Sequence, residues 1–196
     1  MRTFIIFLSF AVISVTGFIA CIGNIRQADA APAAALTHDS LVSRGSYLVS
    51  TIGCDDCHSP KRMGAHGPEV IPELRLSGFT KGRMLPPVDT GAIKKGWALF
   101  SPDLTATVGP WGISYAANIT SDATGIGSWT EAQFIKAIRE GKSKGLDNTR
   151  PLLPPMPWFN FAKLTDTDLK AIYVFLQSTK PVENAVPAPV PPNAIQ

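Results

Sequence analysis

Apolar residues recur at helical spacing in three stretches of the 196-residue chain. This spacing predicts amphipathic helices, each with one face toward a shared core. The first helix is expected over residues 40–52, the second follows a Ser128–Glu131 capping box and ends near Gly141, and the third starts at Thr165. The apolar residues that define the three faces are Leu41, Tyr47, Leu48 and Ile52; Phe134, Ile135 and Ile138; and Leu169, Ile172, Tyr173 and Leu176.

Gly45 lies inside the first predicted helix, where glycine is less favourable than alanine. Such a residue is explained if another backbone approaches closely at that position. We therefore expect the first and last helices to cross closely at Gly45, against Tyr173.

Residues 59–120 are rich in proline and glycine and have little helical periodicity. The segment is too long for a bare loop, so it predicts an irregular subdomain that covers the core. Two of its pieces, KKGWALF and GPWGISYAANIT, are compatible with short strands or turns. The expected fold class is mainly α, with one domain over residues 40–180 and residues 59–120 as an irregular insertion. Residues 31–39 are a linker, and residues 181–196 are a proline-rich tail predicted to be extended.

Residues 1–30 have the features of an export signal: Arg2, a long apolar run, and a small-x-small end at Ala28–Ala30. The apolar run is also nearly long enough to span a bilayer, which leaves a helical anchor open. Phe18–Cys21 resembles a lipoprotein cleavage box, so a lipid anchor at Cys21 is a third alternative. All three alternatives place the domain outside the cytoplasm, in or facing the periplasm.

Composition and charge exclude several classes of protein. Apolar residues make up 45% of the chain and charged residues 17%, so a core can form. The net charge of +3 is too mild, and the basic residues too scattered, to indicate nucleic-acid binding. Only Cys54 and Cys57 lie within the predicted domain, and they are too close in sequence to form a disulfide framework.

The stretch CDDCH, Cys54–His58, carries the most specific chemical signal. A redox dithiol requires C-x-x-C at a helix start within a βαβ unit, but here the motif follows a helix. A zinc site requires about four ligands, and only His38 and His66 could add to the motif. The spacing C-x-x-C-H is typical of covalent haem attachment, with two thioether cysteines and an iron-ligating histidine. The sequence therefore favours one covalent haem, with the dithiol and the zinc site as alternatives.

The second axial ligand of such a haem would decide the function. Met156 lies in LLPPMPWF, where flanking prolines stiffen the backbone and can aim a thioether. A His/Met pair saturates the iron, so the protein would transfer single electrons and perform no bond chemistry itself. An open or displaceable sixth position would instead indicate a peroxidase-like or ligand-sensing protein. The alternative ligands to Met156 are Met63, Met84, His38 and His66.

The first helix, the C-x-x-C-H motif, the isolated methionine and the closing helix together resemble the class I c-type cytochromes. The chain also resembles the haem modules of periplasmic dehydrogenase cytochrome subunits. That similarity runs from about Ser43 to Val186 and is closest at RGSYLVSTIGCDDCH and from Asn118 onward. The resemblance implies a helical fold around one haem c, with Cys54 and Cys57 as thioether cysteines and His58 and Met156 as axial ligands. It also implies a dehydrogenase, an oxidase or another cytochrome as the redox partner.

Several further residues are candidates for the haem surroundings. Trp158 and Phe159 can line the pocket together with Trp129 and Tyr115, and Trp129, Tyr115 or Arg139 can bond a propionate. Five basic residues are candidates for a docking face toward an acidic partner. They are Lys61, Arg62, Arg75, Lys81 and Arg83.

Overall fold

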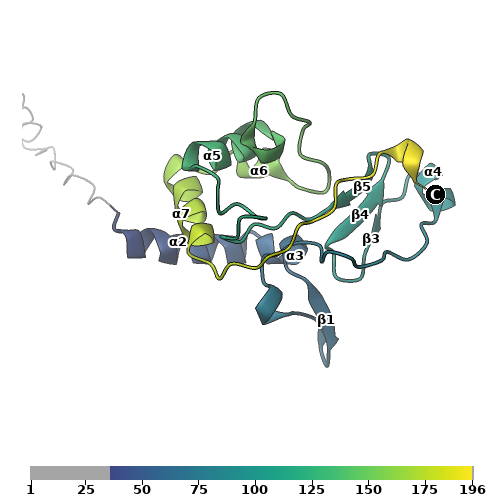
Figure 1. Ribbon diagram of the computed structural model, residues 1–196, viewed down its shortest axis with the longest axis horizontal. Helices are drawn as coiled ribbons and strands as arrows, with labels where there is room; N and C mark the ends of the chain where they lie inside the picture. The colour runs from purple at the N-terminus through teal and green to yellow at the C-terminus, as the bar shows by residue number, and fades with distance from the viewer. Residues whose placement is uncertain (1–35, 196) are drawn as a thin grey trace, which may run out of the picture. The chain divides into compact units, whose positions relative to one another are not determined.

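The computed structural model describes residues 36–195 (Figure 1). The predicted export signal, its alternative anchor at Cys21 and most of the linker lie outside the described residues. Among the helices of residues 36–195, none has the length and apolar character needed to cross a bilayer.

Two long helices at the ends of the domain pack against each other. Helix α2, His38–Thr51, begins after Thr37, whose hydroxyl accepts a hydrogen bond from the Ser40 amide. Helix α7, Asp166–Gln177, begins after Thr165, which caps the Asp168 amide in the same way. The first and last predicted helices are therefore confirmed, within the usual shift of one or two residues at their ends.

Helices α2 and α7 approach each other closely at Gly45. A Cβ at this position would lie 2.0 Å from the Ala171 carbonyl oxygen and 2.6 Å from Phe175 Cβ. The expected crossing is confirmed, but the contacting residues are Ala171 and Phe175 and not Tyr173. Tyr47, predicted on the buried face of α2, is 60% exposed, because the helix turns this residue away from α7.

Helix α5, Glu131–Glu140, is the third predicted helix. Its capping box consists of Thr130 and Gln133, two residues after the predicted Ser128–Glu131 pair. The reason is local: the Trp129 amide already donates to the Ile126 carbonyl in a preceding turn, so the helix begins later. Gly141 ends the helix in the left-handed conformation with φ 63°, as expected for a C-terminal cap.

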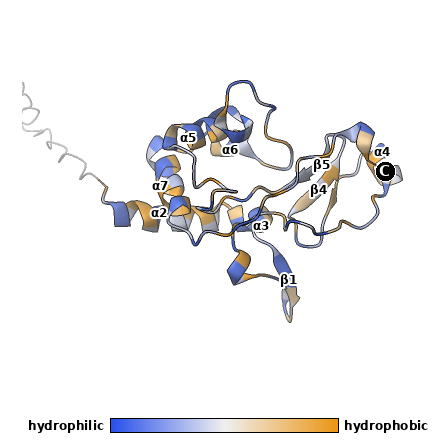
Figure 2. Cartoon of the chain, in the orientation of Figure 1, coloured by the Kyte–Doolittle hydropathy of each residue, from blue (hydrophilic) through white to orange (hydrophobic). Residues whose placement is uncertain are grey.

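One hydrophobic core joins these three helices. Its buried members come mainly from α2, α5 and α7, and Leu76 and Ile126 add to it from loops. Figure 2 shows apolar and polar positions alternating along α2, as expected for a helix with one buried face. The core cluster consists of Leu48, Val49, Leu76, Ile126, Phe134, Ile138, Leu169, Ile172, Phe175 and Leu176.

The insertion contains two small antiparallel sheets, which confirms the expectation of short strands. The first is a hairpin, and the second has the strand order β3-β4-β5, in which Thr107 of β4 pairs with Ser114 of β5. The elements are β1 (Lys61–Gly64), β2 (Gly67–Val70), η1 (Pro72–Leu74), α4 (Thr90–Lys94), β3 (Leu99–Phe100), β4 (Ala106–Gly109) and β5 (Gly112–Tyr115).

The remaining elements are short. Helix α3, Cys54–His58, follows α2 directly, and α6, Trp158–Phe161, follows the predicted methionine loop. Single 3₁₀ turns occur at η2, Ser143–Gly145, and η3, Pro192–Ala194.

Residues 181–190, the C-terminal strap, run in extended form from α7 to the edge of β5 (Figure 1). Val190 and Ile113 exchange two backbone hydrogen bonds of 2.8 and 3.0 Å. Asn184 is 7% exposed, and its side chain bonds the Ser77 and Phe79 carbonyls and the Lys81 amide. The strap therefore connects α7 with two separate parts of the insertion.

Candidate functional site

Helix α3 presents the CDDCH motif at the end of α2. Gly53 separates the two helices with φ 79°, a left-handed conformation that glycine adopts without strain. Cys54 packs against the hydrophobic core cluster, and Cys57 is half-buried. Both thiols are free, so the motif is not closed as a disulfide.

The environment of the two thiols does not suit a redox dithiol. Burial raises the pKa of Cys54 to about 12, and the nearby carboxylates of Asp55 and Asp56 act in the same direction. Burial also raises the pKa of Cys57. Reactive dithiols need a lowered thiol pKa, so the structure gives that alternative no support. Within residues 36–195, no group of three or more His, Cys, Asp or Glu side chains is arranged to hold a metal ion.

His58 is held at both its backbone and its ring. Its Nδ1 lies 2.7 Å from the carbonyl oxygen of Ala117, and its own carbonyl accepts from the Gly78 amide at 2.7 Å. A carbonyl can only accept, so Nδ1 carries the hydrogen and Nε2 presents a lone pair in the neutral ring. Burial lowers the pKa of His58, which favours that neutral form. These features fit the nitrogen ligand of a haem iron.

Asp55 anchors α3 to the insertion. Its carboxylate accepts two hydrogen bonds from Arg75, at 3.0 and 2.8 Å, and one from Ser59 at 2.6 Å. Burial opposes the charge of Asp55, but these bonds outweigh it and lower the pKa of the carboxyl group. Lys61 Nζ lies within hydrogen-bond distance of four backbone carbonyl oxygens, three of them within residues 55–59 and the fourth that of Asp103.

These contacts leave fewer basic side chains available for the predicted docking face. Lys61 and Arg75 bond the chain internally, and Arg83 pairs with Asp103. Their charges are used to hold the insertion against α3 and within itself. Arg62 and Lys81 are exposed.

Met156 differs from the other candidates for the second axial ligand. Met63 and Met84 are 73% and 86% exposed, and His38 and His66 are exposed as well. Met156 is half-buried and packs against the same core cluster that Cys54 contacts. The structure therefore brings Met156 to the core that α3 borders and leaves the other four candidates at the surface.

Hydrogen bonds fix the loop that carries Met156. The Leu152 amide donates to the Gly141 carbonyl at 2.7 Å, and the Met156 amide donates to the Leu153 carbonyl at 3.2 Å. The Ser114 hydroxyl of β5 donates to the Pro154 carbonyl at 2.6 Å. Trp158 packs on Gly141, where a Cβ would lie 2.4 Å from the indole ring.

The other predicted pocket residues are placed as follows. Trp129 packs against the core cluster, and its carbonyl accepts from the Tyr173 hydroxyl at 2.8 Å. The ring of Tyr115 lies 4.7 Å from that of Phe79. Arg139 donates to the Ala162 carbonyl and to the Asp166 carboxylate, so its guanidinium connects α5 with the beginning of α7. Burial raises the pKa of Tyr115, which stays protonated.

Trp158 and Phe159 lie at the beginning of α6. Their rings meet edge to face at 6.2 Å between centroids. Trp158 is half-buried, whereas Phe159 is 58% exposed, so only Trp158 has the burial expected of a residue that lines a pocket.

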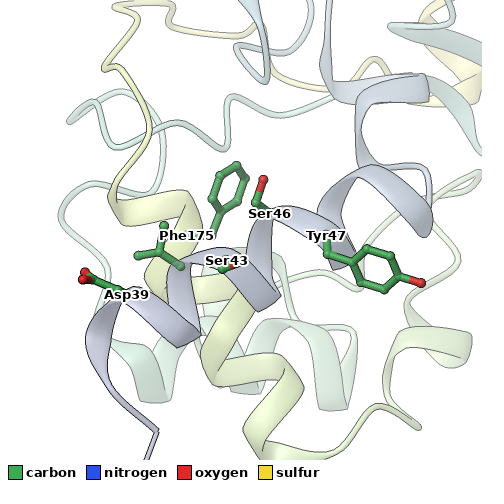
Figure 3. A pocket seen from close by; sticks show the side chains of 6 residues that line it. Asp39, Ser43, Ser46, Tyr47 and Phe175 are labelled. Atoms are coloured by element: carbon green, nitrogen blue, oxygen red, sulfur yellow. The ribbon is translucent and has the colours of Figure 1, made fainter.

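A recess on the surface of α2 contains none of the candidate ligands. It is lined by Asp39, Val42, Ser43, Ser46, Tyr47 and Phe175. Figure 3 shows these side chains on α2 and α7, with the Tyr47 hydroxyl pointing away from Phe175. The recess shares Phe175 with the core cluster but includes no candidate ligand.

Sequence reasoning missed the groups that hold the two candidate ligand segments. The partner of His58 is the backbone carbonyl of Ala117, and Gly78 makes room for it, because a Cβ there would lie 2.6 Å from that oxygen. A backbone acceptor has no signature in sequence. Ser114 shows a signal only in retrospect, as a polar residue that is 8% exposed on a strand.

Comparisons with known proteins confirm the resemblance to the cytochrome c subunits of dehydrogenases. The chain is 31% identical over 167 residues to the fructose dehydrogenase cytochrome subunit of Gluconobacter japonicus. It is 32% identical over 150 residues to the gluconate 2-dehydrogenase cytochrome c subunit of Pantoea cypripedii. It is 41% identical over 145 residues to the cytochrome c subunit of the quinone alcohol dehydrogenase of Gluconacetobacter polyoxogenes.

These matches cover most of this chain but only a small part of each relative. They cover 84%, 76% and 73% of this chain, but only 26%, 25% and 23% of the respective relatives. The chain thus spans about a quarter of the length of these curated relatives. No protein-family model matches the chain.

Proposed function

We propose that the protein is an exported c-type cytochrome that carries single electrons through one covalently bound haem. Cys54 and Cys57 hold the haem by thioether bonds, and His58 and Met156 are the axial ligands. Haem supplies the one-electron couple of its iron, while the chain supplies the ligands, their orientation and a surface for redox partners. The similarity to cytochrome subunits supports the class, and the sequence features of residues 1–30 support export.

The observation that carries the proposal is the common core of Cys54 and Met156. Both side chains pack against one hydrophobic cluster, although they lie far apart in the sequence. The Nδ1 hydrogen bond of His58 leaves Nε2 as the ligating nitrogen. A neutral imidazole and a thioether favour Fe(II) and leave no position for a substrate, which supports a carrier over a catalyst.

The redox partner follows from the relatives as part of the same proposal. The cytochrome subunits to which the chain is similar belong by name to dehydrogenases. We infer that this chain accepts electrons from a dehydrogenase and passes them to an oxidase or to another cytochrome. Because the sequence contains one C-x-x-C-H motif, one haem per chain is part of the proposal.

Two measurements test the proposal. Protein made together with the haem-attachment machinery should retain haem on a denaturing gel, and Cys57→Ser should weaken that retention. The reduced wild-type protein should bind carbon monoxide slowly, because Met156 must leave the iron first. Met156→Ala should bind it rapidly, and the matched variant Met84→Ala, at an 86% exposed position, should behave like wild type.

The outcomes discriminate between the functions. If wild type and Met156→Ala bind carbon monoxide equally fast, Met156 is not the ligand and the carrier function loses its support. An open sixth position of that kind would favour a peroxidase-like or ligand-sensing protein. If haem leaves the wild-type chain on denaturation, the proposed covalent attachment at Cys54 and Cys57 is wrong.

A further inference from the structure

One strand of the insertion contacts the segments of both proposed axial ligands. The Ser114 hydroxyl in β5 donates to the Pro154 carbonyl at 2.6 Å, two residues before Met156. Three residues after Ser114, the Ala117 carbonyl accepts from His58 Nδ1 at 2.7 Å. The two ligand segments are thus bonded to a single continuous piece of backbone.

Ser114 is in a fixed position. It is 8% exposed, and it lies opposite Thr107 of β4 in the antiparallel sheet. On the other edge of β5, Ile113 exchanges two backbone hydrogen bonds with Val190 of the C-terminal strap. The Trp111 Nε1 donates to the Ser114 hydroxyl at 3.3 Å. Because β5 is paired on both edges, the strand holds the Ser114 hydroxyl in a rigid position.

The methionine loop has few polar groups with which to hold itself. Pro154, Pro155 and Pro157 lack an amide hydrogen, so the backbone around Met156 cannot form a regular hydrogen-bonded structure. The Met156 amide closes a turn on the Leu153 carbonyl, but this local bond does not fix the place of the loop relative to the rest of the chain. The Leu152 amide connects the start of the loop to the Gly141 carbonyl, and the Ser114 hydroxyl connects the loop at the Pro154 carbonyl, nearer to Met156.

The continuation of β5 is held equally well on the His58 side. The Phe79 amide donates to the Ala116 carbonyl at 2.9 Å, and the Ile119 amide donates to the Leu76 carbonyl at 2.9 Å. These two bonds bracket Ala117. The Ala117 carbonyl also lies against Gly78, where no side chain can fit.

We propose that β5 and its continuation to Ala117 set the positions of both axial ligands, and that Ser114 is a positioning residue for Met156. The proposal rests on the proposed function, since it concerns the bond between Met156 and the haem iron. It gives the insertion a role: its three-stranded sheet supports the ligand loop from outside the helical core. Loss of the Ser114 bond frees the loop and makes the methionine easier to displace.

The test compares four proteins by their rate of carbon monoxide binding in the reduced state. Ser114→Ala should bind about five to ten times faster than wild type, the factor that corresponds to one net hydrogen bond. Ser114→Thr keeps a hydroxyl on a strand and should remain close to wild type. The control is Ser101→Ala, which loses buried hydrogen bonds to Asp103 and Ala106 near the same sheet but has no bond to the methionine loop.

A second readout is the visible spectrum of the oxidised protein, in which methionine ligation gives its own charge-transfer absorption. Ser114→Ala should lose this absorption at a lower temperature than Ser101→Ala does. Equal carbon monoxide rates in wild type and Ser114→Ala, with the haem retained, would overturn the positioning role. A rate for Ser101→Ala that matches Ser114→Ala would also overturn it, because the effect would then be general loosening.

Failure of this proposal can be told apart from failure of the proposed function. Suppose that wild type and Ser114→Ala both bind carbon monoxide slowly, while Met156→Ala binds it rapidly. The carrier function then holds, and only the role of Ser114 is wrong. If wild type is as fast as Met156→Ala, there is no methionine bond for Ser114 to protect, and the proposed function itself is wrong.

Discussion

Gly45→Ala is a substitution for which helix propensity and packing predict opposite results. Alanine in place of an interior glycine stabilises a helix by about 0.5–1 kcal/mol. In this chain the new Cβ would lie 2.0 Å from the Ala171 carbonyl oxygen, whereas ordinary contacts begin at 3.4 Å. The helices α2 and α7 would have to separate by the difference, 3.4 − 2.0 = 1.4 Å.

The free-energy cost of that separation decides whether Gly45→Ala stabilises or destabilises the protein. The obstacle is a helix backbone, which cannot rotate away as a flexible side chain can, and Phe175 Cβ lies 2.6 Å from the same position. Overpacking of a well-packed core costs about 1–3 kcal/mol, and a backbone obstacle places this case at the upper end. After the gain in propensity, we expect Gly45→Ala to lower the free energy of unfolding by about 2 kcal/mol.

Thermal and denaturant unfolding of the haem-loaded protein measure this loss. For a chain of this size, about 2 kcal/mol corresponds to a midpoint lower by about 4–8 °C. Gly91→Ala in α4 is the matched control, because its nearest neighbour is the flexible Asp89 carboxylate at 3.1 Å. It should stay within about 1 kcal/mol of wild type. A Gly45→Ala protein as stable as wild type would refute the close helix crossing.

Two further predictions concern buried polar contacts that hold the insertion. Asn184→Ala should lower the free energy of unfolding by about 2–5 kcal/mol, because it leaves the buried Ser77 and Phe79 carbonyls and the Lys81 amide without their partner. Arg83→Met should cost about 1–3 kcal/mol at pH 7, because it removes the cation paired with the carboxylate of Asp103.

The loss in Arg83→Met should depend on pH. Burial opposes the charge of Asp103, but hydrogen bonds from Arg83, Ser101 and Thr105 outweigh it and hold the pKa of the carboxyl group below its ordinary value of 3.8. A lowered pKa in the folded state means that the stabilisation is complete above about pH 4 and is lost as the pH falls through the lowered pKa. The difference between wild type and Arg83→Met should therefore shrink in acid.

Unfolding midpoints measured by denaturant at several pH values check both variants. Glu183→Ala, an exposed neighbour on the strap, is the control for Asn184→Ala and should change stability by less than about 0.5 kcal/mol. A loss in Asn184→Ala no greater than in this control would contradict the role of the strap. A constant difference for Arg83→Met down to pH 3 would show that the charge of Asp103 does not carry the effect.

Local patterns were sufficient to predict the helices and the motif. Helical spacing located α2, α5 and α7, because each buries one face in a common core. The motif Cys54–His58 predicts covalent haem attachment, because that attachment needs fixed residue types at a fixed spacing. Met156 could be preferred over Met84 from its prolines, and its packing against the core agrees with that preference.

What the sequence could not show depends on contacts between distant segments. The cap of α5 lies two residues later than predicted, because a turn at Ile126 occupies the Trp129 amide. Tyr47 has the spacing of a core residue but faces outward, since the position of α7 decides which side of α2 is covered. The support of His58 by Ala117 and of the methionine loop by Ser114 requires the sheet to be in place.

The C-terminal strap also makes the surroundings of α3 depend on residues far along the chain. Asn184 bonds the carbonyls on both sides of Gly78, and the Gly78 amide donates to the His58 carbonyl. A change in the strap can therefore reach His58 through two hydrogen bonds, although Ser77 and Asn184 are 107 residues apart in the sequence. The strap acts as a distant brace for the helix that carries the motif.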